Sequence, residues 1–420
     1  MRVFKFGGAS VSSVEEINNS CEIIKAYSQS PMVVIVSAMG KTTNALELLA
    51  QMFFKEESCH QALDEILHFH YQIMDSLFEG NRDLAVTANK YIGKLIERLQ
   101  REPSENFDYE YDQIVSYGEL ISTSILSDYL NYIGLNNTWV DARHVVRTDN
   151  NYREGVVNWE KTQKKILKVV LPILENAENS IVVSQGFIAG TDEYTTTTLG
   201  REGSDYSAAI FAYSLDATDV TIWKDVPGLL NADPKYFKDA IKLNKISYKE
   251  AIELAYYGAT VIHPKTIKPL QNKSIPLFVK SFKNFHDEGS VIGNDSDSNN
   301  TPCYIFKRNQ ALISIYPIDF SFIAEENLSL IFGLFAHFGV KINLMQNSAI
   351  SFSVCVDYKP ESLKGLIEEL NTEFKVRYNL DLELITVRNY DQQTIDKVVR
   401  SRKIFTEQKS RITTQLVVGE

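Results

Sequence analysis

The stretch from Thr195 to Ala208 (T-T-T-T-L-G-R-E-G-S-D-Y-S-A) constrains the fold of this chain more than any other. It follows a short apolar run at 181–184, typical of a buried strand, and leads into an apolar helical pattern. A strand that passes through small polar residues into a helix builds an anion site, because backbone N–H groups and the positive helix end point at the charge. Arg201 adds a planar fork that can hold a carboxylate or phosphate by two bonds, and Asp205 can hold a cation or an ammonium group. We expect an anionic small molecule to bind here beside a nucleotide phosphate.

Composition limits the classes of protein to consider. The 420 residues predict two or three domains, and 44% hydrophobic and 23% charged residues are typical of a globular protein. A net charge of −11 argues against nucleic acid or a membrane surface as a partner. The four cysteines lack C-x-x-C spacing, which is typical of free thiols in a reducing compartment. The first strand begins at Arg2 without a signal region, and no apolar run approaches transmembrane length, so we expect a cytoplasmic protein.

Apolar runs typical of strands alternate with helical patterns over the first two thirds of the chain. The runs lie at 2–6, 32–37, 138–141, 181–184, 220–223 and 275–281. This alternation predicts an α/β sandwich around a mostly parallel central sheet. Residues 56–110 have helical spacing and are expected to form a helical insertion. The histidines in it lack paired carboxylates or thiolates, so we expect a surface helical face and no metal site at His60, His68 and His70.

A change of pattern divides the chain. Residues 284–301 are rich in Asn, Asp, Ser and Gly and predict a linker between a first domain at 1–283 and a second region at 302–420. Beyond the linker the order βαββαβ over about 80 residues predicts an α+β, ferredoxin-like unit. At most a reduced second unit follows, built from 301–307, a helix at 395–405 and a strand at 412–418. Small units of this kind expose a sheet edge, so pairing with a second copy is expected.

Two more strands end in residues suited to small anions. The first ends in K-F-G-G-A-S, where Lys5 supplies a mobile charge and Gly7 and Gly8 allow a close backbone approach to a phosphate. The second ends in S-A-M-G-K-T-T-N. A P-loop would need a glycine where Ile35 stands, so we expect a polar pocket lining instead, from Ser37, Thr43 and Asn44.

Three further segments complete the pattern. Gly118-Glu119 lies within a helical pattern, and by itself Glu119 is explained as a solvated carboxylate. Gln185–Phe187 directly precedes the central loop, where a flexible approach to a ligand is expected. Trp223–Lys235 leaves a strand through a Pro-Gly turn and ends in Asp-Pro. Open α/β sheets bind their ligands in such loops at the carboxyl ends of strands.

All these segments, followed by I-S-Y-K-E-A-I-E-L-A-Y-Y-G-A-T-V-I-H-P at Ile246–Pro264, come in the order found in aspartate kinases. The chain resembles an aspartokinase, a member of the amino acid kinase family, over essentially its whole length, and 302–420 resembles the ACT-type regulatory region of those enzymes. The resemblance implies transfer of the ATP γ-phosphoryl group to the β-carboxylate of L-aspartate, the first step of lysine, threonine, methionine and diaminopimelate biosynthesis. A carboxylate with a pKa of about 4 is already ionised at neutral pH, so the reaction needs cations and positioning rather than a base.

The resemblance also implies roles for individual residues. Lys5 would offset the charge between the β-carboxylate and the γ-phosphate, with Asp205 as the second catalytic residue. Arg201 would hold the α-carboxylate, and Glu119 and Asp205 would receive the α-ammonium group. Ser37, Thr43 and Phe187 would shape this pocket. The phosphates and the nucleotide would contact Gly7, Gly8, Ser10, Ser204, Lys224, Asp225 and Lys235, with Mg²⁺ on the phosphates and no dedicated protein ligands.

The chain departs from the family pattern on the nucleotide side. Glu202 occupies a usual glycine, Leu230 a common tyrosine, and Thr260 stands where a lysine is frequent. Lys224 replaces a common threonine and Lys235 a common arginine. These changes bear on the affinity for ATP, whereas the residues expected to bind aspartate are intact.

Regulation and two alternatives stay open at this point. The family's Gly-rich effector turn is replaced by Asp319–Glu325, which has no glycine. Feedback inhibition by lysine or threonine, and a homodimer through the ACT region, are expected from the resemblance alone. The alternatives are another amino acid kinase with a different carboxylate acceptor, and a non-catalytic amino-acid-sensing subunit. Arg201, Glu119 and Asp205 together favour a zwitterionic amino acid as the ligand.

Overall fold

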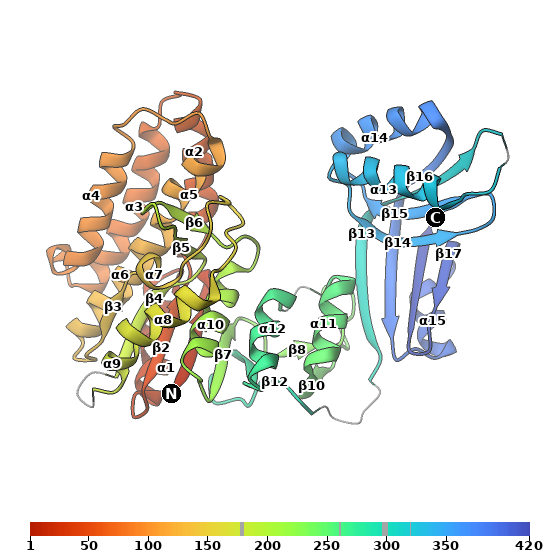
Figure 1. Ribbon diagram of the computed structural model, residues 1–420. Helices are drawn as coiled ribbons and strands as arrows, with labels where there is room; N and C mark the ends of the chain where they lie inside the picture. Colours follow the sequence, from red (N-terminus) through yellow and green to blue (C-terminus); the bar gives the residue numbers. More distant parts are fainter. Residues whose placement is uncertain (177–179, 260–261, 296–300, 320) are drawn as a thin grey trace. The chain divides into compact units, whose positions relative to one another are not determined.

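A computed structural model describes residues 1–176, 180–259, 262–295, 301–319 and 321–420, and it divides the chain into two compact units (Figure 1). The first unit comprises 1–229, 242–252 and 260–297, and the second comprises 230–241, 253–259 and 298–420. Two short segments before residue 260 therefore belong with the C-terminal unit, although their sequence does not indicate it. Among the described helices, none has the length and apolar character needed to cross a membrane.

The first unit is built on an eight-stranded sheet, and its α/β class and mostly parallel strands confirm the prediction. Every neighbouring pair is parallel except β11 with β12. Central parallel strands are covered on both faces and are therefore apolar throughout, as in the fully buried M-V-V-I-V of β2. The spatial order is β10 (Lys245–Ser247), β12 (Ser290–Gly293), β11 (Leu277–Ser281), β7 (Asp219–Lys224), β1 (Arg2–Phe6), β2 (Met32–Val36), β4 (Ile181–Gln185) and β3 (Thr138–Val140).

Strand β12 lies inside the segment predicted to be a linker, so that prediction is wrong for Ser290–Gly293. The strand has only two apolar residues, too few to show a period in sequence. Its pairing with β10 and β11 fixes its conformation. The sheet therefore extends past residue 283, the predicted end of the first domain.

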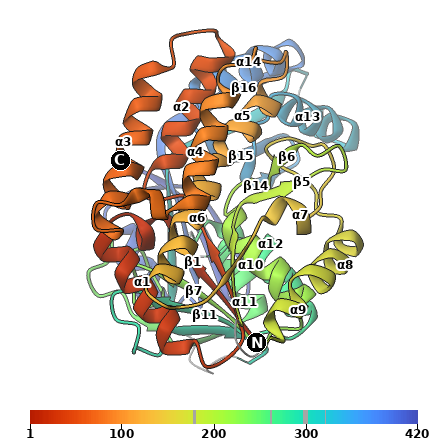
Figure 2. The ribbon, with the colours of Figure 1, turned by 90° about the vertical axis from the view of Figure 1, so that its left-hand side faces the viewer.

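Helices cover both faces of this sheet (Figure 2). Helix α6 (Tyr117–Tyr132) packs against β2, β3 and β4, and α10 (Gly203–Ser214) packs against β1, β2 and β7. The other helices of this unit are α1 (Val14–Tyr27), α2 (Thr42–Phe54), α3 (His60–Leu77), α4 (Val86–Arg98), α5 (Phe107–Val115), α7 (Ala142–Val145), α8 (Trp159–Val169), α9 (Leu171–Leu174) and α12 (Pro264–Asn272), while α11 (Tyr248–Tyr257) spans both units.

The predicted helical insertion at 56–110 contains α3 and α4, and α5 runs past its end. His70 on α3 is buried, and its Nδ1 lies 2.7 Å from the carbonyl oxygen of Ile66. The prediction of a surface position is therefore wrong for His70, because the apolar face of α3 is broad enough to include it. Burial lowers the pKa of this imidazole, which favours its neutral form.

The second unit contains a six-stranded antiparallel sheet. Its two central strands, β13 (Cys303–Pro317) and β16 (Phe374–Arg388), are long and pair along most of their lengths. Each end of this pair packs in a separate small hydrophobic core. One end packs beneath α13 (Glu325–His337) and α14 (Pro360–Glu373), in the predicted order βαββαβ. The spatial order is β14 (Ile342–Asn347), β15 (Phe352–Asp357), β13 (Cys303–Pro317), β16 (Phe374–Arg388), β18 (Thr413–Gly419) and β17 (Lys403–Lys409).

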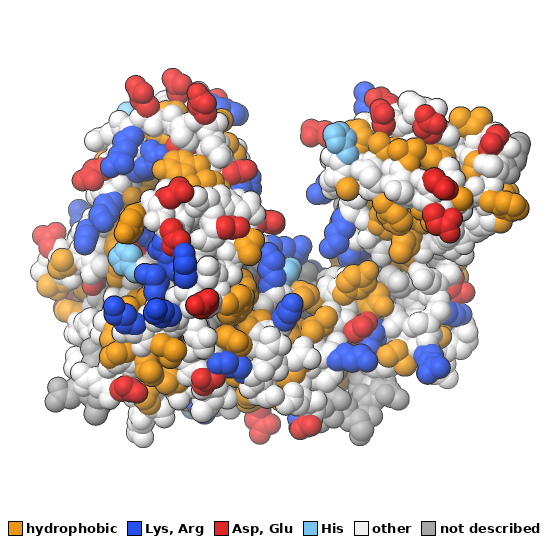
Figure 3. Space-filling view, viewed as in Figure 1, with side chains coloured by type: hydrophobic (Ala, Val, Ile, Leu, Met, Phe, Trp, Pro, Cys, Tyr) orange, Lys and Arg blue, Asp and Glu red, His pale blue; other side chains and the backbone are white. Residues whose placement is uncertain are grey.

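The other end of this sheet carries one helix, α15 (Gln392–Val399). The predicted helix at 395–405 is wrong beyond Val399, because Arg400 takes a left-handed backbone (φ 54°) and the chain continues into β17. Part of the cover comes from the 230–241 segment, where the ring of Phe237 stacks on Tyr304 at 4.7 Å. Figure 3 shows acidic and basic side chains interspersed over the visible face of each unit.

Candidate active site

A cavity of about 810 Å³ lies at the carboxyl end of the central sheet in the first unit. Strands β1, β2 and β4 are parallel neighbours, so their ends meet at one edge. Lys5 comes from β1, Ser37 directly follows β2, and Phe187 follows β4. Nine residues predicted from sequence line this cavity: Lys5, Ser37, Thr43, Asn44, Glu119, Phe187, Arg201, Ser204 and Asp205.

The loop before α10 shapes one wall of the cavity. Gly200 (φ 75°) and Glu202 (φ 56°) take left-handed conformations, after which the helix begins at Gly203. Gly186 packs against its first turn, where a Cβ atom would lie 2.5 Å from the Cβ of Ser204, so only glycine fits. The N-terminus of α10 thus opens on the cavity with the serine in its first turn, as an anion site requires.

A buried ion pair joins β1 to α10. Nζ of Lys5 lies 2.7 Å from Oδ1 of Asp205, and Nζ of Lys224 lies 3.6 Å from Oδ2 of the same carboxylate. Burial alone would raise the pKa of Asp205, but the two lysines outweigh it and hold this pKa below its usual range. The carboxylate therefore stays ionised and fixes the Lys5 amine at the cavity wall.

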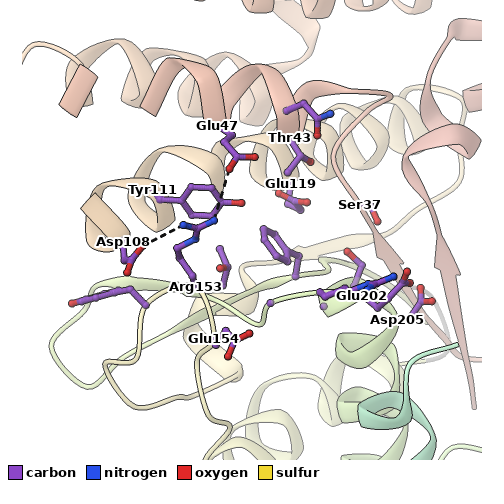
Figure 4. A pocket seen from close by; sticks show the side chains of 18 of the residues that line it. Ser37, Thr43, Glu47, Asp108, Tyr111, Glu119, Arg153, Glu154, Glu202 and Asp205 are labelled. Carbon is purple, nitrogen blue, oxygen red and sulfur yellow. Dashed lines mark hydrogen bonds and ion pairs between the residues drawn. The ribbon is translucent and has the colours of Figure 1, made fainter. Parts of the chain in front are cut away.

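Glu202 lies beside the same charged side chains, Asp205, Lys5 and Lys224. Burial, and then the neighbouring Asp205 carboxylate, raise the pKa of Glu202, while Lys224 and Lys5 oppose that rise. The net effect raises the pKa of Glu202 above its usual range. Figure 4 shows Glu202 and Asp205 close together at one end of the cavity.

Glu119 is held at the other wall by α6 and is only 2% exposed. Its Oε1 accepts the backbone N–H of Ala38 at 3.2 Å, while its Oε2 has no hydrogen-bond partner among the described residues. Burial raises the pKa of Glu119 to about 8. The prediction of a solvated carboxylate from the helical pattern alone is wrong, and the buried free oxygen suits a cationic ligand group.

Two guanidinium groups line the cavity. Arg201 is exposed, and within the described part of the chain no carboxylate pairs with it. Arg153 was not predicted. Its Nη1 lies 3.3 Å from Asp108 and its Nη2 3.8 Å from Glu47, and it sits 4.3 Å above the Tyr111 ring (Figure 4). In sequence Arg153 stands in an ordinary polar loop, and the left-handed backbone that turns it here (φ 67°) leaves no sequence signal.

The remaining predicted residues do not line this cavity. Lys224 reaches it through Asp205, and Asp225 is exposed just past the end of β7. At Gly8 a Cβ atom would lie 2.7 Å from the carbonyl oxygen of Ala38, so close backbone packing by itself accounts for this glycine. Ser10 is buried, and Gly7 lies just past the end of β1. Lys235 and Leu230 belong to the second unit, and Thr260 lies outside the described residues.

No cluster of three or more His, Cys, Asp or Glu side chains suited to a metal ion occurs among the residues described. Six more cavity residues were missed from sequence because they come from loops and helices without a motif: Glu47, Asp108, Tyr111, Asn151, Tyr152 and Glu154.

Comparison with known proteins identifies the family. The profile of the amino acid kinase family matches residues 1–281. The chain is 30% identical over 407 residues to lysine-sensitive aspartokinase 3 of Escherichia coli (strain K12), covering 93% of this chain and 87% of that protein. It is also 30% identical over 385 residues to aspartokinase 1, chloroplastic, of Arabidopsis thaliana, covering 87% of this chain and 65% of that protein.

Solved structures agree. The structure of E. coli aspartokinase III in complex with aspartate and ADP (R-state) superposes with a TM-score of 0.83 at 27% identity, covering 100% of this chain and 96% of that one. The same enzyme in complex with lysine and aspartate (T-state) gives a TM-score of 0.81 with the same coverage. The chain therefore belongs to the amino acid kinase family and, within it, to the aspartokinases.

Proposed function

We propose that this chain transfers the γ-phosphoryl group of ATP to the β-carboxylate of L-aspartate, giving 4-phospho-L-aspartate for aspartate-family amino-acid biosynthesis. The observation that carries the proposal is one cavity that presents the Lys5 amine, the Arg201 guanidinium and the buried Glu119 carboxyl together. A molecule with two carboxylates and an ammonium group matches these three charges. The relatives named above, one of them solved with aspartate and ADP, support the same acceptor.

The chemistry follows from the positions of the charges. Arg201 holds the α-carboxylate by two bonds, and Glu119 receives the α-ammonium group as a carboxylate. Lys5, fixed by Asp205, lies between the β-carboxylate and the incoming phosphoryl group and lowers the repulsion between two anions. The β-carboxylate is already ionised, so no residue needs to remove a proton. ATP supplies the phosphoryl group.

The nucleotide is proposed to bind at the α10 end of the cavity. Ser204 and the backbone of Gly203 stand in the first turn of α10, and the close packing of Gly186 holds this turn in place. An anionic phosphate fits there beside Lys5. Gly7, Gly8, Ser10, Lys224, Asp225 and Lys235 remain proposed nucleotide contacts on the resemblance, and Mg²⁺ is proposed to accompany ATP with no assigned protein ligands.

Regulation is proposed for the second unit. Lysine is the first effector to test, because the E. coli relative is lysine-sensitive and has been solved with lysine bound; threonine is the second. The outer strands β14 and β17 each pair on one side among the described residues, which supports a homodimer through this sheet. Activity assays with millimolar lysine or threonine, and light scattering after gel filtration, test the two proposals. The cytoplasmic location stays a prediction.

Trapping the product tests the proposed reaction. Hydroxylamine converts an acyl phosphate into a stable hydroxamate, so the chain is incubated with MgATP, hydroxylamine and one candidate acceptor. Aspartate should give aspartyl hydroxamate, and glutamate or N-acetylglutamate should give little. A hydroxamate from glutamate alone would indicate another amino acid kinase. No hydroxamate from any acceptor would favour a non-catalytic sensing subunit.

A further inference from the structure

The charge balance of the cavity is unusual for a site that takes anions. Among the described residues, its lining carries six carboxyl groups and three cations, Lys5, Arg153 and Arg201. Lys5 is committed to Asp205, and Arg201 is proposed to hold the substrate. Arg153 is the cation with no assigned task. The six acids are Glu47, Asp108, Glu119, Glu154, Glu202 and Asp205.

Exposure separates the cavity into a buried end and a mouth. The side chains of Lys5 and Asp205 are 10% and 1% exposed, whereas those of Arg153, Glu47 and Asp108 are 41%, 38% and 55% exposed. We call Glu47, Asp108, Glu154 and Arg153 the mouth cluster. With its acids ionised, this cluster has three negative charges and one positive charge. Any small molecule that enters there meets a net negative charge.

The mouth cluster adjoins the proposed amino-acid side of the cavity. Thr43 and Glu47 stand four residues apart on α2, so they share one face of that helix, one turn from each other. Figure 4 shows Arg153 between Glu47 and Asp108, with Glu119 and Thr43 nearby and Asp205 farther away. The charge of Arg153 therefore acts on the amino acid more than on the nucleotide phosphates.

The backbone places Arg153 at the mouth. Its N–H donates to Oδ2 of Asp112 at 2.8 Å, and the same carboxylate accepts the N–H of Thr198 at 2.9 Å on β6 (Thr196–Thr198). The loop is thus tied to the strand that precedes Gly200–Glu202. A left-handed backbone is rare for a long side chain, and here it directs the guanidinium onto the Tyr111 ring and between two acids.

We infer that Arg153 sets the affinity of this site for an anionic amino acid by offsetting one of the three negative charges of the mouth cluster. The inference rests on the proposed function, because it assumes that an amino acid with net negative charge enters here. Without Arg153, three carboxylates repel that molecule, and the repulsion weakens as salt screens it. Arg153 takes no part in the phosphoryl transfer, so turnover at saturating aspartate is unaffected by its charge.

The test uses Arg153→Met, which keeps an apolar stem over Tyr111 and removes the charge. At low ionic strength the KM for aspartate should rise about three- to tenfold, with kcat and the KM for ATP nearly unchanged, and the rise should shrink to about twofold or less at roughly 0.5 M salt. The double variant Glu47→Gln/Arg153→Met restores the original net charge of the mouth, so its KM for aspartate should return to the wild-type value.

Arg82→Met is a matched control, and calorimetric titration is a second readout. Arg82 also pairs with an acid, Asp75 at 3.5 Å, and lies 4.5 Å from an aromatic ring, Tyr71, but it is outside the cavity. Arg82→Met should leave the KM for aspartate unchanged. Calorimetric titration with aspartate alone measures the affinities of wild type, Arg153→Met and the double variant without turnover. A failed kinase assay with wild type would therefore count against the proposed function and leave the Arg153 inference testable.

Two results would overturn the inference. One is an unchanged affinity for aspartate in Arg153→Met at low salt. The other is a loss that neither salt nor the Glu47→Gln change relieves, because that loss would come from a distorted loop and not from charge.

Discussion

Glu119 gives the chain a proton switch that a pH series can measure. In the free protein burial raises the pKa of its carboxyl to about 8, so at neutral pH most molecules carry it protonated. The proposed role needs the carboxylate, because only that form pairs with the α-ammonium group of aspartate. Binding of aspartate should therefore expel a proton from Glu119, and the perturbation to test is Glu119→Gln, which keeps the shape and cannot ionise.

The pKa of Glu119 determines how strongly the affinity for aspartate depends on pH. Only the ionised fraction binds, so with a pKa of about 8 the apparent affinity for aspartate should rise roughly tenfold from pH 6 to pH 7 and level off above pH 8. At pH 7 about 0.9 protons should leave for each aspartate bound. The affinity for aspartate rises as pH rises, because Glu119 holds the proton in the free protein and has lost it in the aspartate complex.

Isothermal titration calorimetry in two buffers of different ionisation enthalpy counts the released protons. Wild type should release nearly one at pH 7, and Glu119→Gln should bind aspartate weakly, with no release and no dependence on pH. Glu154→Gln serves as a control, because this exposed glutamate lines the same cavity and its removal should leave the proton release intact. Wild-type affinity that is flat between pH 6 and pH 8, with no proton released, would refute the reasoning.

Three other predictions follow from the same cavity. Arg201→Lys removes the two-bond fork and should weaken aspartate binding about tenfold or more while changing ATP binding much less; equal losses in the two titrations would contradict the assignment. Gly186→Ala places a Cβ atom 2.5 Å from Ser204 and should lower the free energy of unfolding by about 1–3 kcal/mol and weaken ATP binding, as thermal melting and nucleotide titration would show. Glu119→Gln should also flatten part of the pH dependence of stability. The wild-type carboxyl keeps its proton in the folded state up to a pKa of about 8, whereas the unfolded chain releases it near the ordinary value of 4.5, so wild-type stability falls between these pH values; a melting-temperature difference between the two proteins that does not change with pH would contradict this.

Sequence was sufficient for the parts of the fold that repeat a simple pattern. Each predicted strand of the first domain is present, and the central ones, such as β2, are continuous apolar runs because both faces of a parallel sheet are covered. Strands β12 and β17 were not predicted, since β12 has two apolar residues and five of the seven residues of β17 (K-I-F-T-E-Q-K) are polar. Only their partners in the sheet determine them. The end of α15 was also missed, because a left-handed arginine carries no sequence signature.

The site also contains residues that could be predicted from sequence and residues that could not. Lys5, Ser37 and Phe187 were predictable because they follow from strand ends that a parallel sheet brings together. Arg153 and Asp108 could not be predicted, because they come from a loop and a helix that approach the cavity only in the folded chain. Lys224 stays a proposed nucleotide contact from the resemblance, and the structure adds that its amine lies 3.6 Å from Asp205.

The central claim is that fixed cations in one cavity bring two anions together without a proton acceptor. A crystal structure of the chain with L-aspartate and a non-hydrolysable ATP analogue tests it most directly. We expect the α-carboxylate on the Arg201 guanidinium and the Lys5 amine between the β-carboxylate and the terminal phosphate. Aspartate bound away from Arg201, or a β-carboxylate that contacts a side chain able to take a proton instead of Lys5, would contradict it.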